Sequence, residues 1–159
     1  MKFNGNISFK GVYTIDVIDK NGKQKYYEVI ENLIVNAGLA EIAGLIGNTG
    51  SPTAFTYLAV GSGSTAATAT DTTLETELTD GGLERSSATV TRATTTATND
   101  TLQLVKTFTV TDTKTVREVG VFNASENGDM MSRSVLTADK NLESGDTFIL
   151  TYKLICKND

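Results

Sequence analysis

The chain has 159 residues and a net charge of −5, with one cysteine and no histidine or tryptophan. This length can bury enough apolar surface for one domain over residues 1–159 to fold without a metal or a disulfide. The acidic balance disfavours nucleic-acid binding, which needs clustered Lys and Arg, and neither a membrane-spanning apolar run nor a signal peptide is found, so no nucleic-acid or membrane partner is predicted.

The first predicted element is a β-hairpin. Segments rich in apolar and β-branched residues, 7–10 and 12–18 on one side and 23–30 on the other, flank the dipeptide Asn21-Gly22. Asn-Gly is a strong hairpin signal because both residues tolerate a positive φ. Residues 1–31 are therefore interpreted as an N-terminal hairpin that could serve as an attachment extension of the domain.

A short helix is predicted next, over residues 37–46. Leu39, Ile42 and Ile46 recur at helical spacing. Asn36 is a candidate N-cap, and Gly47 fits a left-handed position at the C-terminus. Because one side of this helix is strongly apolar, we expect it to pack on a sheet.

The middle of the chain alternates between short elements and polar loops. Residues 55–60 predict a strand, which ends at a glycine-rich turn over 61–64, followed by a Thr/Ala-rich surface loop. In segment 71–78, Leu74 and Leu78 are four residues apart, which predicts a short helical turn with both side chains facing inward.

Strands alone are predicted after residue 81. Segment 85–96 is polar and threonine-rich, as expected of an edge strand. The remaining strands are expected at 101–110, 116–122, 130–137 and 147–156. Cys156 falls in the last of them and is expected to be a buried small hydrophobe.

About eight closely spaced strands and one helix predict a mainly β fold. We expect an antiparallel β-sandwich or a jelly-roll-like domain with the short helix packed on it.

No constellation of residues indicates catalysis, and no catalytic, cofactor-binding or metal-ligating residue is assigned. A Ser-His-Asp triad is impossible without histidine, and Cys156 lacks an imidazole partner. The glycine-rich turn lacks the Gly-Lys-Ser/Thr of a phosphate-binding loop, so a plain strand exit is favoured over a phosphate site. Asp16, Asp19 and Asn21 could hold a weak cation, but a turn with side-chain-to-backbone hydrogen bonds is favoured there.

Charged residues inside the apolar strands predict cross-strand pairs. Arg117 and Glu118 are adjacent, so they point to opposite faces of one strand. Glu118 and Arg133 lie in consecutive strands, and we expect them to form an ion pair that fixes strand register rather than one that takes part in catalysis.

A series of motifs in fixed order suggests a family. The series is Asn32-Leu33-Ile34-Val35-Asn36-Ala37-Gly38-Leu39, Tyr57-Leu58-Ala59-Val60-Gly61-Ser62-Gly63, Asp71-Thr72-Thr73-Leu74-Glu75-Thr76-Glu77-Leu78, Arg117-Glu118-Val119-Gly120-Val121-Phe122-Asn123, Met130-Met131-Ser132-Arg133 and Ser144-Gly145-Asp146-Thr147. Over residues 32–153 it resembles small structural proteins of the tailed-bacteriophage virion, including tail-fibre-like, minor structural and capsid decoration proteins. The resemblance implies a non-enzymatic role in the particle, with no catalytic residues.

The sequence thus predicts a virion structural protein, made in the host bacterial cytoplasm, that decorates the capsid or forms part of a tail or fibre. Its expected partners are copies of itself, as a homo-oligomer such as a trimer, and other virion proteins of the capsid or tail. The alternative is a carbohydrate-binding adhesion module. The aromatic residues that could form its sugar platform are Tyr13, Tyr26, Tyr27 and Tyr57, and two of them are expected to face the core.

Overall fold

The structure is a computed structural model that describes residues 6–158, and in this part of the chain it has ten strands and one helix. The elements are β1 (Ile7–Ile18), β2 (Gln24–Glu31), β3 (Leu33–Ile34), α1 (Asn36–Gly47), β4 (Tyr57–Gly61), β5 (Ser86–Ser87), β6 (Thr89–Ala93), β7 (Thr101–Thr109), β8 (Lys114–Phe122), β9 (Met130–Leu142) and β10 (Thr147–Asn158).

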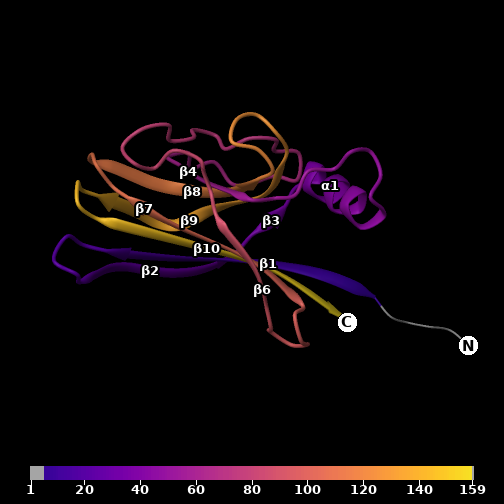
Figure 1. The fold of residues 1–159 in the computed structure, drawn as a ribbon. Helices are drawn as coiled ribbons and strands as arrows, with labels where there is room; N and C mark the ends of the chain where they lie inside the picture. Colours follow the sequence, from indigo (N-terminus) through magenta and orange to yellow (C-terminus); the bar gives the residue numbers. More distant parts are fainter. Residues whose placement is uncertain (1–5, 159) are drawn as a thin grey trace, which may run out of the picture.

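The strands form two five-stranded antiparallel sheets that pack face to face (Figure 1). Sheet A has the order β2-β1-β10-β7-β6, and sheet B has the order β3-β9-β8-β4-β5. The predicted β-sandwich with one short helix is therefore confirmed. Sheet A joins strands from both ends of the chain, because β1 pairs with β10 from Ile7↔Asn158 to Ile18↔Thr147.

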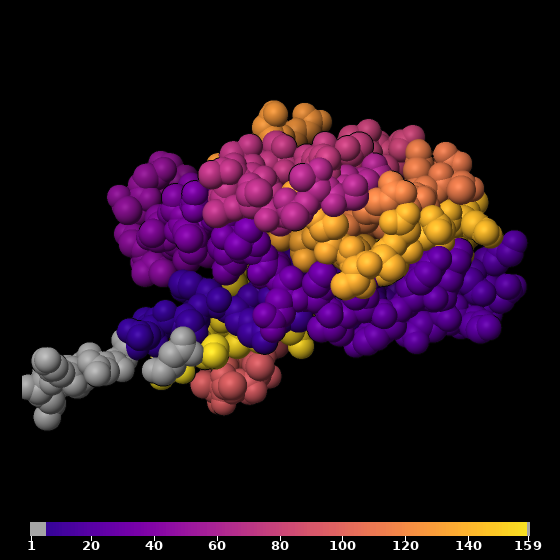
Figure 2. All heavy atoms as spheres, turned by 180° about the vertical axis from the view of Figure 1, so that it is seen from behind, coloured from indigo at the N-terminus to yellow at the C-terminus, as the bar shows by residue number. Residues whose placement is uncertain are grey.

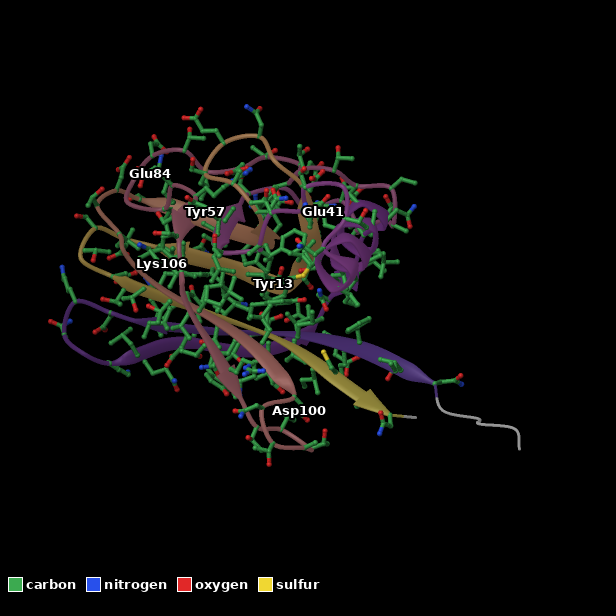
Figure 3. The ribbon with its side chains drawn as sticks, turned by 45° about the vertical axis from the view of Figure 1, so that its right-hand side comes forward. Tyr13, Glu41, Tyr57, Glu84, Asp100 and Lys106 are labelled. Atoms are coloured by element: carbon green, nitrogen blue, oxygen red, sulfur yellow. The ribbon has the colours of Figure 1, made fainter. Side chains whose placement is uncertain are left out.

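The main core lies between the sheets and follows from alternation along the strands. In β1, Tyr13, Ile15 and Val17 face inward and are fully buried, while the residues between them are half-buried on the other face. Tyr13 lies between the sheets (Figure 3) and packs on Tyr152 with ring centroids 4.8 Å apart. Its hydroxyl is 2.7 Å from Oγ of Ser132 in sheet B, so a hydrogen bond joins the two sheets inside the apolar core.

The first hairpin forms as predicted, with a turn that is held by a side chain. Gly22 has a φ of 82°, whereas Asn21 does not reach positive φ. The Asp19 carboxylate instead accepts hydrogen bonds from the N–H groups of Asn21 and Lys23, at 2.8 and 2.9 Å. The Asp19 side chain therefore stabilises this turn, which is the role of an asparagine at positive φ in a two-residue hairpin turn.

Helix α1 is one residue longer at each end than predicted, and both predicted caps are wrong. The N-cap is Val35, with no side-chain capping bond, and Asn36 is already helical; its N–H bonds the carbonyl of Ala69. At the C-terminus Asn48, not Gly47, adopts the left-handed conformation, with a φ of 46°. The helix packs on β9 as expected of an apolar helix beside a sheet.

The helical turn predicted over residues 71–78 is wrong, because the segment is irregular, with bends at residues 73, 75 and 76 and an isolated β-bridge between Glu77 and Gly61. Leu74 and Leu78 still point inward, but the backbone N–H groups of Glu75 and Thr76 bond the side chain of Glu118. The N–H of Leu78 bonds the carbonyl of Val60. A local i, i+4 pattern was therefore overridden by partners that are distant in sequence.

The single edge strand predicted over residues 85–96 forms as two short edge strands in different sheets, β6 in sheet A and β5 in sheet B. The other later strands occur near their predicted places, although β9 continues to Leu142. In β7 and just after it, Leu104, Phe108 and Val110 are buried and Leu102 packs against the main core, so this strand presents an apolar face to the space between the sheets.

The expected burial of Cys156 is wrong. Cys156 is exposed, because β10 extends beyond the part of sheet A that sheet B covers. Partial burial and the nearby Asp100 carboxylate raise the pKa of this thiol above its usual value.

We therefore expect the folded protein to give one reactive thiol per chain in a thiol-disulfide exchange assay without denaturant. At neutral pH the reaction should be slower than in the unfolded chain, because a raised pKa leaves less thiolate. The rate should rise with pH. A Cys156→Ser variant is the blank, and a thiol that reacts only after denaturation would contradict the exposed position.

The two outer faces of the sandwich differ. The β4–β5 loop (residues 62–85) and helix α1 lie over sheet B, where a second small core forms (Figure 1). This core consists of Val35, Ala59, Leu74, Phe122 and Met130. The outward side chains along the middle of sheet A are half-buried or exposed. Within residues 6–158, no helix has both the length and the apolar character that a bilayer crossing requires.

Candidate functional site

A buried ion pair on the outer face of sheet B connects the β4–β5 loop to the two strands that carry the pair. Glu118 of β8 is fully buried and Arg133 of β9 is 3% exposed, and Nε of Arg133 lies 2.8 Å from Oε2 of Glu118. Gly120 is the residue opposite Arg133, so the pair spans the two strands diagonally. The predicted Glu118–Arg133 pair is therefore present, with its side chains on the face that the β4–β5 loop covers.

The Glu118 carboxylate also binds three backbone N–H groups of the β4–β5 loop. Gly63 and Thr76 donate to Oε1 at 3.0 and 2.8 Å, and Glu75 donates to Oε2 at 3.0 Å. A buried carboxylate needs such donors to offset its lost hydration. Glu118 thus fastens both ends of the loop segment 63–76 to sheet B.

Glycine is required where the loop passes over this carboxylate. A Cβ atom added at Gly61 or at Gly63 would lie 2.5 Å from Oε1 of Glu118. The glycine-rich turn does bind an anion through a backbone N–H group, but the anion is a carboxylate of the same chain.

Arg133 extends the network to the other side of the loop. Its Nη1 lies 2.9 Å from Oδ2 of Asp71, and its Nη2 donates to the carbonyl of Thr65 at 3.0 Å. Burial alone would lower the pKa of Arg133, but the hydrogen bonds to Glu118 and Asp71 outweigh it and raise that pKa. The guanidinium stays charged and gives each of its nitrogens an oxygen partner.

The carboxylates at the rim of the network are also held in their charged form. Partial burial would raise the pKa of Asp71, but hydrogen bonds from Thr68 and Arg133 hold it below the usual value. The pKa of Glu75 is lowered by hydrogen bonds from Thr65.

Acid should therefore loosen the β4–β5 loop. Because the folded pKa values of Asp71 and Glu75 lie below their unfolded values, their stabilisation is complete above about pH 5 and is lost as pH falls through the folded values. We expect a thermal midpoint that is constant from about pH 5 to 7 and falls below about pH 4. Asp71→Asn should make that fall shallower. An unchanged acid slope in this variant would contradict the assignment.

Two further arginines fix neighbouring segments. Arg117 points to the opposite face from Glu118 and pairs with Asp139 of β9 through two contacts of 2.8 Å, as the cross-strand prediction requires. Arg85 lies 3.5 Å from the ring centroid of Phe122 and pairs with Glu77 at 2.6 Å. It also donates to the carbonyl of Asn127 at 2.7 Å, which joins the β4–β5 loop to the β8–β9 turn.

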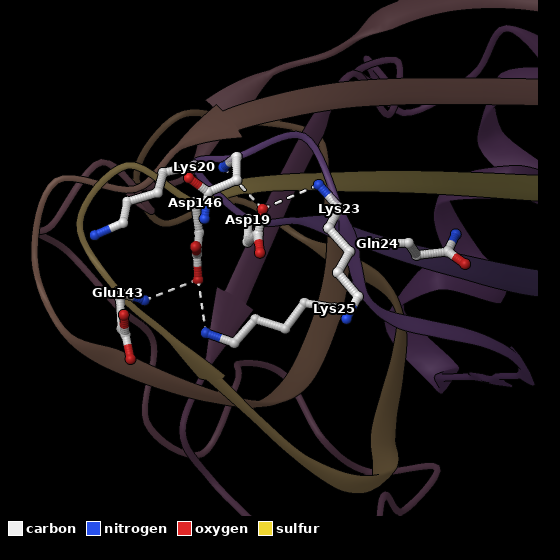
Figure 4. Close-up of a pocket in the computed structure, with 8 residues that line it drawn as sticks. Asp19, Lys20, Lys23, Gln24, Lys25, Glu143 and Asp146 are labelled. Atoms are coloured by element: carbon white, nitrogen blue, oxygen red, sulfur yellow. Dashed lines mark hydrogen bonds and ion pairs between the residues drawn. The ribbon is translucent and has the colours of Figure 1, made fainter.

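The candidate cation site near the first hairpin is a set of internal hydrogen bonds instead. The Asp19 carboxylate bonds its own turn, and Oδ1 of Asp16 accepts from Gln24 at 2.8 Å. Figure 4 shows the shallow pocket beside this turn, where buried Asp146 accepts hydrogen bonds from Lys25 and from the N–H of Glu143. No metal-binding group of His, Cys, Asp and Glu occurs among residues 6–158.

The four tyrosines proposed as a sugar platform do not come together on the surface. Tyr13 is buried, and Tyr26 and Tyr57 pack against the two cores. Tyr27 is 61% exposed. Since sugar platforms present flat aromatic faces to solvent, this arrangement does not favour the carbohydrate-binding alternative.

Sequence reasoning found the ion pair but missed its loop partners. Asp71 and the carbonyl of Thr65 were not connected with Arg133, and the glycines at 61 and 63 were not connected with Glu118. The available signal was the order of the motifs, because the segments around Gly61, Asp71, Glu118 and Arg133 meet in this one network.

The comparisons with known proteins agree with that order of motifs. No curated protein matched the chain. The family model described as "Podophage GP4 fiber I protein gp80" matches residues 29–155, a range that includes the whole ion-pair network and the whole segment in which the motifs occur. A match over most of the chain shows the family, and the suggested resemblance to phage virion structural proteins is confirmed. The chain belongs to the podophage GP4 fiber I protein gp80 family, and its role is that of a phage virion structural protein.

Proposed function

We propose that this protein is a non-enzymatic subunit of a bacteriophage fibre, which acts through self-association and through contacts with other virion proteins. The family match over residues 29–155 is the observation that carries the proposal. The matched range includes all of sheet B, the β4–β5 loop and, in sheet A, β6, β7 and most of β10. Among the locations predicted from sequence, the fibre is favoured over capsid decoration.

The use of the buried charges supports a structural role. Glu118, Arg133, Lys140 and Asp146 are the buried charged side chains of the described residues, and each bonds a backbone group. All four also form ion pairs: Glu118 with Arg133, Asp146 with Lys25, and Lys140 with Glu28 of β2. These groups hold loops and strands in place, as expected of a rigid building block.

Two parts of the chain are suited to contacts in the particle. The free edge of β6 can accept a strand from a neighbour, as edge strands do in strand addition. The first hairpin lies mostly outside the matched residues, and we propose it as the attachment extension. The expected assembly is a homo-oligomer, such as a trimer, synthesised in the host cytoplasm and found in the virion.

Electron microscopy of purified particles carrying gold-labelled antibody against the full chain tests this proposal. We expect label on fibres, with one cluster of copies per fibre, and the first hairpin at the contact with the next virion protein in a reconstruction. Label over the capsid surface would favour decoration instead. Absence of the chain from purified particles would overturn the proposed function.

A further inference from the structure

The outer face of sheet A differs from an ordinary solvent-exposed sheet face. Antiparallel sheets usually carry polar, often charged, side chains on the side away from the core. Here the strand registers place β-branched and apolar residues side by side across all five strands. The central row is Val29, Thr14, Thr151, Val105 and Thr89.

The rows on either side extend this surface. We define the open face of sheet A as the central row with its two flanking rows. One flanking row is Tyr27, Asp16, Ile149 and Thr107, and the other is Glu31, Val12, Lys153, Gln103 and Thr91. Tyr27 and Val29 are 61% and 55% exposed, and the residues on β1 and β10 are half-buried by their neighbours.

The outer face of sheet B also carries apolar side chains, and there a loop covers them. On sheet B, Ala59, Phe122 and Met130 face outward and are buried beneath the β4–β5 loop, which the Glu118 network fastens in place. Figure 2 shows this loop, in magenta, as a continuous layer over one side of the molecule. The open face of sheet A has no comparable layer within residues 6–158, although its central row is equally poor in charge.

The charges on the open face balance. Glu31 is paired with Lys10 at 2.5 Å on the same side of the sheet, which leaves Asp16 and Lys153 with opposite signs. The chain as a whole carries −5, so two copies repel one another through most of their surfaces. The open face is a surface on which two copies can meet without that repulsion, and Asp16 and Lys153 can complement each other between copies.

The size of the open face also fits a contact between copies. Five strands about 4.8 Å apart, with the five residues per strand that the three rows span at about 3.4 Å each, make a surface of about 400 Å². A stable protein interface buries about 800 Å² on each partner. The open face therefore supplies about half of the area that one stable contact needs, and the residues around it would supply the rest.

We infer that the open face of sheet A is the self-association surface of this protein and is buried against a second copy of the chain. The inference rests on the proposed function, which includes self-association. It adds which surface of the protein makes the contact between copies. Sheet-on-sheet packing at about 10 Å would interdigitate the Val, Ile and Thr side chains of two copies. Because each copy presents the same face, this contact joins copies in pairs, and a trimer would need a different contact, such as strand addition at β6.

A pair of matched lysine substitutions tests the inference. Thr151→Lys places a charge at the centre of the open face, on the middle strand. Thr72→Lys is the control, because Thr72 is an exposed threonine in the β4–β5 loop on the opposite side of the molecule. Sedimentation velocity over a concentration series gives the association constant, and circular dichroism with thermal unfolding shows that each variant is folded.

We expect the wild type and Thr72→Lys to associate equally, and Thr151→Lys to associate about a hundredfold more weakly. If Thr151→Lys left the association constant unchanged, the open face would not be the self-association surface. The proposed fibre role would still stand. A wild-type chain that stays monomeric at high concentration would overturn the inference and the self-association on which it rests. Electron microscopy of particles tests the fibre location independently of this association experiment.

Lysine acetylation of the wild-type protein provides a second readout that needs no variant. Lys153 lies on the open face, whereas Lys20 is exposed in the first hairpin outside it. Dilution from oligomer to monomer should raise the reactivity of Lys153 several-fold and leave Lys20 unchanged. Equal reactivity of Lys153 in both states would overturn the inference even if Thr151→Lys failed to fold.

Discussion

Arg133→Met is expected to lower the free energy of unfolding by about 3–5 kcal/mol, the largest effect of any change considered for this protein. The substitution keeps most of the side-chain volume and removes the charge. Glu118 would then remain fully buried without its partner guanidinium. For a domain of this size the thermal midpoint should fall by about 8–15 °C.

Arg117→Met is the matched control, because it makes the same substitution at a neighbouring strand position. Arg117 pairs with Asp139, but both side chains are well exposed, at 38% and 48%. Water and salt screen such a pair, so we expect a cost of no more than about 1 kcal/mol. If urea titrations gave the two variants the same free energy of unfolding, the buried ion pair would contribute no more to stability than the exposed one.

A double-mutant cycle separates the pair from its surroundings. Glu118→Gln alone should be strongly destabilising, because an amide replaces a carboxylate that accepts N–H bonds from Gly63, Glu75 and Thr76. In combination with Arg133→Met the loss should be smaller than the sum of the single losses, with a coupling of about 1–3 kcal/mol. Additive losses would mean that the two side chains are neighbours without a mutual interaction.

Gly38→Ala is expected to destabilise the protein by about 1–3 kcal/mol and to loosen helix α1 from β9. Gly38 is the buried residue of the helix, and a Cβ atom there would overlap the backbone of Met131. Backbone on both sides leaves no flexible side chain to move aside. The helix would have to shift outward, and the small core that contains Val35 and Met130 would lose packing.

Gly47→Ala in the last turn of the same helix is the comparison. A Cβ atom at Gly47 would meet Cγ2 of Thr49 at 3.5 Å, an ordinary contact. There the higher helix propensity of alanine should leave stability unchanged or raise it by up to about 1 kcal/mol. Urea unfolding followed by circular dichroism distinguishes the two outcomes, and equal effects at both glycines would argue against close packing at Gly38.

The parts of the fold that were predictable from sequence are those that depend on local patterns. Alternation along β7 placed Leu104 and Phe108 on one face, and the dipeptide Asn21-Gly22 marked the first hairpin, where Gly22 has positive φ. The Glu118–Arg133 pair was predictable because a charge inside an apolar strand needs a partner on the next strand.

The failed predictions have a common physical cause. Segment 71–78 has a helical spacing of leucines, but the Glu118 carboxylate takes its N–H groups. Asn36 has the side chain of an N-cap, yet the carbonyl of Ala69 binds its backbone first. Cys156 follows the apolar alternation of β10 to a point where sheet B no longer covers it. In each case a contact distant in sequence, or its absence, decided the outcome.

The position of β10 in the middle of sheet A has a consequence for folding during synthesis. β10 lies between β1 and β7, so the β1–β2 hairpin and the β7–β6 pair have no common neighbour until residues 147–158 have left the ribosome. Sheet A therefore closes after translation of its last strand, through contacts that join the most distant parts of the sequence. Such a topology predicts slow folding, on a scale of milliseconds to seconds. Until that strand arrives, the edges of β1 and β7 stay open to the same edges on neighbouring nascent chains, so copies made on one messenger RNA can exchange strands.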